Sequence, residues 1–215
     1  MDADSRQKAV RRREKPGKRT VGSVMLSPER NGRLTASNFA NAMGIGYSSR
    51  QKLWRELTGV DEPFQGNEMT DYGNDNEHKA VDAYEISQNV IVMLSGDNQH
   101  FVKHADHDWL GCTPDGRTSD RLVEFKCPFN GVYDDAPANY LAQVQGQMAI
   151  TSHTQCDLVA WSPDELKIWR VDFSEEYWQA MLELLTEFWS HVQENTEPKR
   201  RKKPVLPALT YFELI

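Results

Sequence analysis

The chain has 215 residues, 39% of them hydrophobic and 27% charged, with a formal net charge of −7 at pH 7, so it is long enough for one substantial globular domain and is neither disordered nor fibrous. Its longest apolar runs are far too short to span a bilayer, and its basic N-terminus lacks the apolar segment of a secretory signal peptide, so we expect a cytoplasmic protein with no membrane contact. The three cysteines, Cys112, Cys127 and Cys156, form no CxxC pair, which excludes the usual zinc and iron–sulfur signatures and suits a reducing compartment.

The chain opens with a basic segment, residues 1–24, which we expect to be a flexible arm. Positions 6–20 hold eight Lys or Arg residues. Five more basic residues, at 199–203, lie near the start of a Pro-containing tail over 198–215. Between 21 and 197 there are 12 basic and 28 acidic residues, a net charge of about −16. The two basic ends are either solvated tails or arms that attract phosphate groups at long range, and the sequence leaves both interpretations open.

Residues 25–197 are predicted to form a single domain, in which helices come first, strands follow and helices return. Thr35 or Ser37 can cap the first helix, and Gly44 lies just past its end. The predicted order is helices at 34–44, 48–59 and 70–89, strands within 89–95, 100–105, 109–116 and 121–128, a helix at 135–152, a β-hairpin at 156–173 and a helix at 174–195. This order predicts an α/β fold with a small mixed β-sheet flanked by helices, because the hairpin excludes a purely parallel sheet.

Two charged residues interrupt the strand predicted at 121–128. Because alternate residues of a strand share a face, Glu124 and Lys126 point together while Phe125 faces the other way. Asp115, in the preceding turn, reaches the same edge if the two strands pair. Two carboxylates and the Phe125 carbonyl form an all-oxygen ligand set that suits Mg²⁺ or Mn²⁺, and a nearby lysine can stabilise or deprotonate an attacking water. The spacing fits metal-dependent phosphodiester hydrolysis, but taken alone it fits a solvent-facing ion pair on an edge strand better.

Polar residues on two predicted helices fit the same chemistry. Glu77 lies on the helix before the strands and offers another carboxylate, although such an acid is often just exposed. Tyr140, Gln143 and Gln147 lie on one face of the later helix, at positions i, i+3 and i+7. An amide on this face can orient a water or contact a phosphate, or can simply be solvated.

A basic residue and two hydroxyls gather where the first helix begins. Arg30 precedes Thr35 and Ser37 in "ERNGRLTASNF". Helix N-termini bind phosphate, and arginine pairs with it through two hydrogen bonds, so this segment predicts either a phosphate site or an ordinary helix cap.

Taken together, these segments resemble the lambda exonuclease family, also called YqaJ-type viral recombinases, of the PD-(D/E)xK nuclease superfamily. The resemblance runs over roughly residues 28–152 and is carried by "RNGRLTASNF", "YGNDNEHKAVDAYE", "GCTPDG", "LVEFKCPF" and "YLAQVQGQMAIT", in that order. The resemblance implies a PD-(D/E)xK nuclease core as the fold.

The resemblance also implies roles for the polar residues. Asp115, Glu124 and the backbone carbonyl of Phe125 would bind catalytic Mg²⁺, for which Mn²⁺ can substitute. Glu77 would act near a second metal or through a water, and Lys126 would assist the nucleophilic water.

Further residues would handle the DNA. Gln143 would position the water or the scissile phosphate. Arg30, Ser37 and Thr113 would form a pocket for a 5′-phosphate, with Thr113 standing where the family often has serine. Thr70 stands nearest to the position of the family's apolar wedge, which separates the strands of the duplex end, and the adjacent Met69 is the apolar candidate for it.

The activity implied by the resemblance is 5′-to-3′ digestion of one strand of linear double-stranded DNA. The products would be mononucleotides and a 3′ single-stranded overhang, within a phage or prophage recombination system in a bacterial host. A homotrimeric ring and a single-strand annealing protein as partner are implied in the same way. Two alternatives stay open: an endonuclease on the same fold, and a non-catalytic DNA-binding module that uses the basic ends.

Overall fold

The computed structural model describes residues 30, 32–95 and 101–214. The basic arm predicted at 1–24 lies outside these ranges, as does His100 at the start of one predicted strand. Within the described ranges, no helix is long and apolar enough to cross a membrane.

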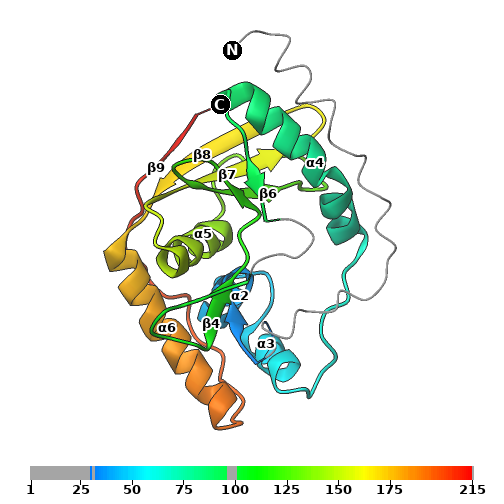
Figure 1. Ribbon diagram of the computed structural model, residues 1–215. Coiled ribbons are helices and arrows are strands. Elements are labelled where there is room, and N and C mark those ends of the chain that lie inside the picture. Colours follow the sequence, from blue (N-terminus) through cyan, green and yellow to red (C-terminus); the bar gives the residue numbers. More distant parts are fainter. Residues whose placement is uncertain (1–29, 31, 96–100, 215) are drawn as a thin grey trace.

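A six-stranded mixed sheet forms the centre of the molecule, in the order β2-β5-β6-β7-β8-β9 (Figure 1). β6 and β7 run parallel, and every other neighbouring pair is antiparallel. The strands are β2 (Met93–Leu94), β5 (Gly116–Arg117), β6 (Leu122–Lys126), β7 (Gln155–Trp161), β8 (Leu166–Asp172) and β9 (Tyr211–Glu213). β6 is therefore an inner strand, hydrogen-bonded on both sides, and the predicted α/β class with a small mixed sheet is confirmed.

Two helices cover opposite faces of this sheet. α4 (Glu68–Gln88) packs on the face that carries Val123 and Phe125, and α5 (Ala138–Thr151) packs on the face that carries Leu122. Both interfaces are built from fully buried apolar side chains, the main source of folding free energy. Because side chains alternate along β6, Glu124 belongs to the α5 face.

A second, smaller layer lies on the far side of α5. It contains the three-stranded sheet β1-β4-β3 and three helices, with one apolar core between them. The elements are β1 (Leu34–Thr35), α2 (Ala36–Met43), α3 (Arg50–Leu57), β3 (Val102–Lys103), β4 (Leu110–Cys112) and α6 (Glu175–Gln193). α2 approaches α5 so closely that a Cβ added at Gly146 would lie 2.4 Å from the Phe39 ring. This close approach brings the start of α2 next to the polar face of α5.

Several predicted boundaries shift in the structure. The helix predicted from Thr70 begins two residues earlier, because Asn67 and Thr70 form a reciprocal capping box. The strand expected within 89–95 shortens to β2, since Asn89 ends α4 in a left-handed conformation. β9 lies inside the tail predicted at 198–215, and its pairing with β8 makes that part of the tail an edge of the sheet.

Candidate active site

Asp115 does reach the edge of β6. β5 and β6 form a tight antiparallel hairpin in which Gly116 pairs with Val123, so the residue before Gly116 lies beside Glu124 and Phe125. The backbone N–H of Phe125 donates a 2.8 Å hydrogen bond to Oδ2 of Asp115. This bond holds the Asp115 carboxylate at the edge of β6, where the sequence predicted a second acid beside Glu124.

Glu124 lies at the bottom of the site and is only 2% exposed. Lys126 Nζ donates to its Oε1 at 2.6 Å, Gln143 Nε2 donates to the same oxygen, and Gln147 Nε2 donates to Oε2 at 2.8 Å. A buried carboxylate needs such donors to offset its desolvation. The alternative of a solvent-facing ion pair on an edge strand is therefore wrong, because Glu124 is buried on an inner strand.

The charges beside Glu124 shift the pKa values of its two neighbours, Asp115 and Lys126. Burial raises the pKa of Asp115 well above its usual range, and the Glu124 and Glu77 carboxylates raise it further, against the opposing effect of Lys126. Burial lowers the pKa of Lys126, but Glu124 and Asp115 more than compensate, so the net pKa lies above its ordinary value. The ammonium stays charged and lies 5.0 Å from the centre of the Tyr140 ring. A charged ammonium can orient a water and stabilise an anion, but it cannot act as a base.

A single cavity of about 1020 Å³ joins these residues to the others predicted from the sequence. Its lining holds the acids and the lysine, both α5 amides, and the three residues predicted to bind a 5′-phosphate. The predicted site residues that line it are Arg30, Ser37, Met69, Glu77, Thr113, Asp115, Glu124, Phe125, Lys126 and Gln143. Residues that lie far apart in the sequence are thus brought to one concave surface.

Polar atoms at one side of this cavity find no hydrogen-bond partner among the residues that the structure describes. Thr113 Oγ1 and Arg30 Nε are buried and make no hydrogen bond within the described residues. Thr35 occupies the N-cap position of α2 but makes no side-chain capping bond, and its hydroxyl lies 3.1 Å from that of Ser37. Buried polar atoms are rarely left unpaired, and uncapped helix N–H groups attract anions, so this corner fits a phosphate.

The fit to a divalent cation follows from acceptor capacity. In the described part of the chain, no three His, Cys, Asp or Glu side chains gather into a metal-binding group. Mg²⁺ does not need one, because it is commonly held by one or two carboxylates and keeps several waters. A carboxylate has about four acceptor positions, of which the described residues occupy three on Glu124 and one on Asp115. Both carboxylates can therefore accept a hard cation, whose charge would relieve their mutual repulsion.

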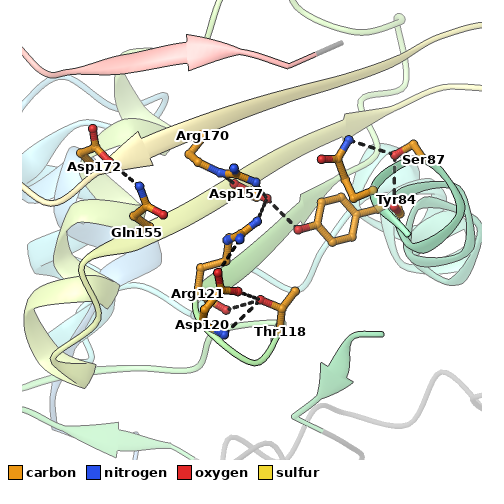
Figure 2. Close-up of polar contacts among 10 residues, drawn as sticks. Tyr84, Ser87, Thr118, Asp120, Arg121, Gln155, Asp157, Arg170 and Asp172 are labelled. Carbon is orange, nitrogen blue, oxygen red and sulfur yellow. Dashed lines mark hydrogen bonds and ion pairs between the residues drawn. The ribbon is translucent and has the colours of Figure 1, made fainter. Parts of the chain in front are cut away.

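A second buried acid, Asp157 of β7, was not singled out from the sequence. It is fully buried on the α4 face and accepts hydrogen bonds from Tyr84 Oη at 2.7 Å, Arg170 Nε at 2.9 Å, Arg170 Nη2 at 3.0 Å and Arg121 Nη1 at 3.4 Å. Figure 2 shows these side chains converging on it: Tyr84 from α4, Arg170 from β8 and Arg121 from the turn before β6. The signal was a lone acid within the apolar run of a central strand, the same signal that identified Glu124.

Gln147 was placed on the correct helix face by the sequence but received no role. Its bond to Glu124 makes it a second amide anchor, one helical turn after Gln143. Its Oε1 is buried without a partner in the described residues.

Comparisons with known proteins agree with this geometry. A family model described as the YqaJ-like viral recombinase domain matches residues 27–154. An alkaline exonuclease from Laribacter hongkongensis, LHK-Exo, superposes with a TM-score of 0.65 at 25% identity, over 77% of this chain and 90% of that one. A phage-related exonuclease from Haemophilus somnus 129PT shares the fold, with a TM-score of 0.57 at 15% identity over 75% and 92% of the two chains. The predicted family resemblance and nuclease fold are confirmed.

A curated viral relative is similar over part of its length. Uncharacterized protein R354 of Acanthamoeba polyphaga mimivirus is 28% identical over 134 residues, which is 53% of this chain. The chain spans about a quarter of that relative, 24% of its length.

Proposed function

Because the chain belongs to the YqaJ-like viral recombinase domain family, we propose that it is a magnesium-dependent exonuclease of phage-type recombination. It degrades one strand of linear double-stranded DNA from the 5′ end, releases mononucleotides and leaves a 3′ overhang. One observation carries the proposal: the paired carboxylates and Lys126 share a cavity with buried donors that have no hydrogen-bond partner in the described part of the chain. A nuclease that holds a terminal 5′-phosphate beside its catalytic acids requires this arrangement.

The metal would be held by Asp115, Glu124 and the Phe125 carbonyl, with Glu77 acting through a water. When bound, Mg²⁺ supplies Lewis acidity and draws the scissile phosphate to the carboxylates. The chain's own groups do the rest. Lys126 keeps its proton, orients the attacking water and stabilises the extra negative charge on the phosphate.

Gln143 and Gln147 act through the carboxylate that they hold. Both amides donate to Glu124 from α5, so the carboxylate is fixed against rotation before substrate arrives. Gln143 also lines the cavity, and its amide oxygen can accept a hydrogen bond from the attacking water. Preorganised polar groups of this kind lower the barrier without having to rearrange during the reaction.

The 5′-phosphate corner sets the direction of digestion. Arg30, Ser37 and Thr113 would bind the terminal phosphate, which places the first phosphodiester bond nearest to the carboxylates. Burial lowers the pKa of Arg30, yet an arginine stays charged at any physiological pH. Its charge, the hydroxyls and the N-terminal N–H groups of α2 together suit a phosphate dianion.

The family also suggests an assembly and a partner for this chain. A homotrimeric ring around the duplex would let an acidic protein act on DNA, since only its channel needs to be positive. A single-strand annealing protein would receive the 3′ overhang. Sedimentation of the purified chain, alone and mixed with such a protein, tests both ideas.

End-labelled linear duplex tests the function directly. With Mg²⁺, a 5′ label should appear at once as mononucleotide while a 3′ label stays on long products, and chelator should stop the reaction. Digestion of a closed circle would instead support the endonuclease alternative. Binding without any product would support the non-catalytic module.

A further inference from the structure

A basic strip, Lys199–Lys203, follows α6 and lies outside the active-site cavity. All five side chains are exposed. Arg201 is the one member of the strip that forms an ion pair with another described residue, with Glu187 at 3.3 Å. The other four positive charges are therefore not neutralised by the part of the chain that the structure describes, although the domain around them is strongly acidic.

The strip is held in place at both ends. On one side Pro198 is buried, and Arg201 is tied to Glu187 of α6. On the other side Leu206 and Leu209 pack against the apolar cores, and β9 then pairs with β8. A strip fixed in this way loses less conformational entropy on binding a ligand than a free basic tail does.

The strip also lies against a loop that borders the cavity. The Arg201 side chain lies 3.5 Å from where a Cβ would stand at Gly44, the first residue after α2. Tyr47, three residues further along the same loop, lines the cavity. A polyanion bound on the strip would therefore lie beside the loop that forms part of the cavity wall.

We propose that the basic strip binds the phosphate backbone of duplex DNA outside the cleavage cavity, without reading its sequence. The proposal rests on the proposed nuclease function and extends it. Four cations that form no ion pair with the described residues, on a segment anchored at both ends, match the charge pattern of a DNA backbone. The paired acids of the cavity repel that backbone in the absence of a cation. The strip would keep the duplex attached while the shortened end re-enters the cavity.

Salt-dependent binding tests the strip without any cleavage. Fluorescence anisotropy with a labelled blunt duplex in chelator gives the dissociation constant of the full chain between about 50 and 200 mM salt. We expect Lys199→Ala/Lys202→Ala/Lys203→Ala to weaken binding about tenfold or more at the lowest salt. The slope of log K against log salt should fall by about 0.9 for each phosphate that the variant no longer neutralises.

Two matched variants separate charge from other effects. Lys199→Arg/Lys202→Arg/Lys203→Arg keeps the charge and should bind like the parent. Lys103→Ala/Arg117→Ala/Lys167→Ala removes the same amount of charge from β3, β5 and β8. It should change the slope less than the alanine variant of the strip does. Arg201 is left intact throughout because it anchors the segment, and thermal melting of each variant checks its fold.

The same variants, assayed with Mg²⁺, distinguish the two proposals. If strip and function are both right, the alanine variant digests a short duplex at saturating concentration with unchanged kcat, but releases long duplex after fewer cleavages. An unchanged slope in the alanine variant, or an equal loss in the Lys103/Arg117/Lys167 control, overturns the strip even if digestion proceeds normally. If the salt slope falls in the alanine variant but the parent chain never cleaves DNA, the strip binds DNA as proposed and the proposed nuclease function is wrong.

Discussion

Two buried carboxylates lie on neighbouring strands of one sheet and face opposite ways. Asp157 of β7 lies under α4 and accepts four hydrogen bonds, from one tyrosine and two arginines (Figure 2). Glu124 of β6 lies under α5 and accepts three, from one lysine and two neutral amides. The first carboxylate has its full acceptor capacity used, and the second does not.

The balance of charge differs in the same way. Around Asp157, one carboxylate meets two guanidinium groups, and burial together with the hydrogen bond to Asp157 keeps the Tyr84 hydroxyl protonated by raising its pKa. Around Glu124, the described residues bring one ammonium, that of Lys126, together with a second carboxylate, that of Asp115. A neutralised buried acid holds a fold together, whereas an excess of buried negative charge beside an open cavity indicates a site for a cation.

The largest expected effect is on catalysis, at the acid-rich face. Asp115→Ala and Lys126→Ala should each lower exonuclease activity by a factor on the order of 10³ or more, since each removes preorganised charge at the reacting phosphate. Quantified mononucleotide release from linear duplex measures the loss, with duplex binding as the control. Near-normal activity in both variants would mean that Glu124 and its neighbours form a structural cluster like that of Asp157.

The next effect should fall on stability, at the opposite face. Asp157→Ala leaves Arg121 and Arg170 without their shared carboxylate and should lower the free energy of unfolding by about 3–5 kcal/mol. Urea denaturation measures this change. Glu124→Gln is the control, because it keeps the shape of the side chain and one acceptor oxygen, and removes negative charge where that charge is in excess. We expect it to cost little stability while abolishing activity, and a reversed pattern would refute the contrast between the faces.

The acid-rich cluster around Glu124 was predictable from the sequence, and the cluster around Asp157 was not. Asp115, Glu124 and Lys126 lie close together along the chain, so strand alternation and one hairpin sufficed to group them. Asp157 meets Arg170 only through the β7–β8 register, and Tyr84 arrives from α4, 73 residues away. Such pairings depend on which strands and helices pack together. β1 and β9 escaped prediction for the same reason, since two or three residues form a strand only when a partner strand is present.

The pH dependence of stability should reflect the burial of Asp115. Asp115 has a folded pKa above its unfolded value of about 3.8, so the folded state holds this proton more tightly than the unfolded state. In chelator, its contribution to the free energy of unfolding therefore falls as pH rises from the unfolded pKa through the folded one. Asp115→Asn should remove this loss, so the variant should gain stability relative to the parent as pH rises above the unfolded pKa. Melting temperatures in EDTA at a series of pH values above the unfolded pKa test it, and added Mg²⁺ should stabilise the parent more than the variant.

The phosphate corner should show a moderate effect that depends on the substrate. Thr113→Val removes a buried hydroxyl with no partner in the described residues, so it should cost little stability but weaken 5′-phosphate binding by about 1–3 kcal/mol. The preference for a 5′-phosphate end over a 5′-hydroxyl end should shrink accordingly. Thr113→Ser keeps the hydroxyl and should retain the preference. If parent and variant digest both ends at equal rates, the corner assigned to Arg30, Ser37 and Thr113 has another purpose.

The smallest effect is expected at the cavity rim, where Met69 is 57% exposed and lines the cavity. If it helps to separate the strands of a duplex end, Met69→Ala should lower the initial rate on a blunt duplex by less than about tenfold, because only part of the unstacking cost of a few kcal/mol falls on one side chain. On a duplex whose 5′ end is already unpaired, the variant should match the parent. Met93→Ala is the control, since Met93 is comparably exposed at 46% and lies on β2 outside the cavity lining. Equal losses on blunt and unpaired ends would place Met69 in general DNA binding, and no loss on either would remove it from the site.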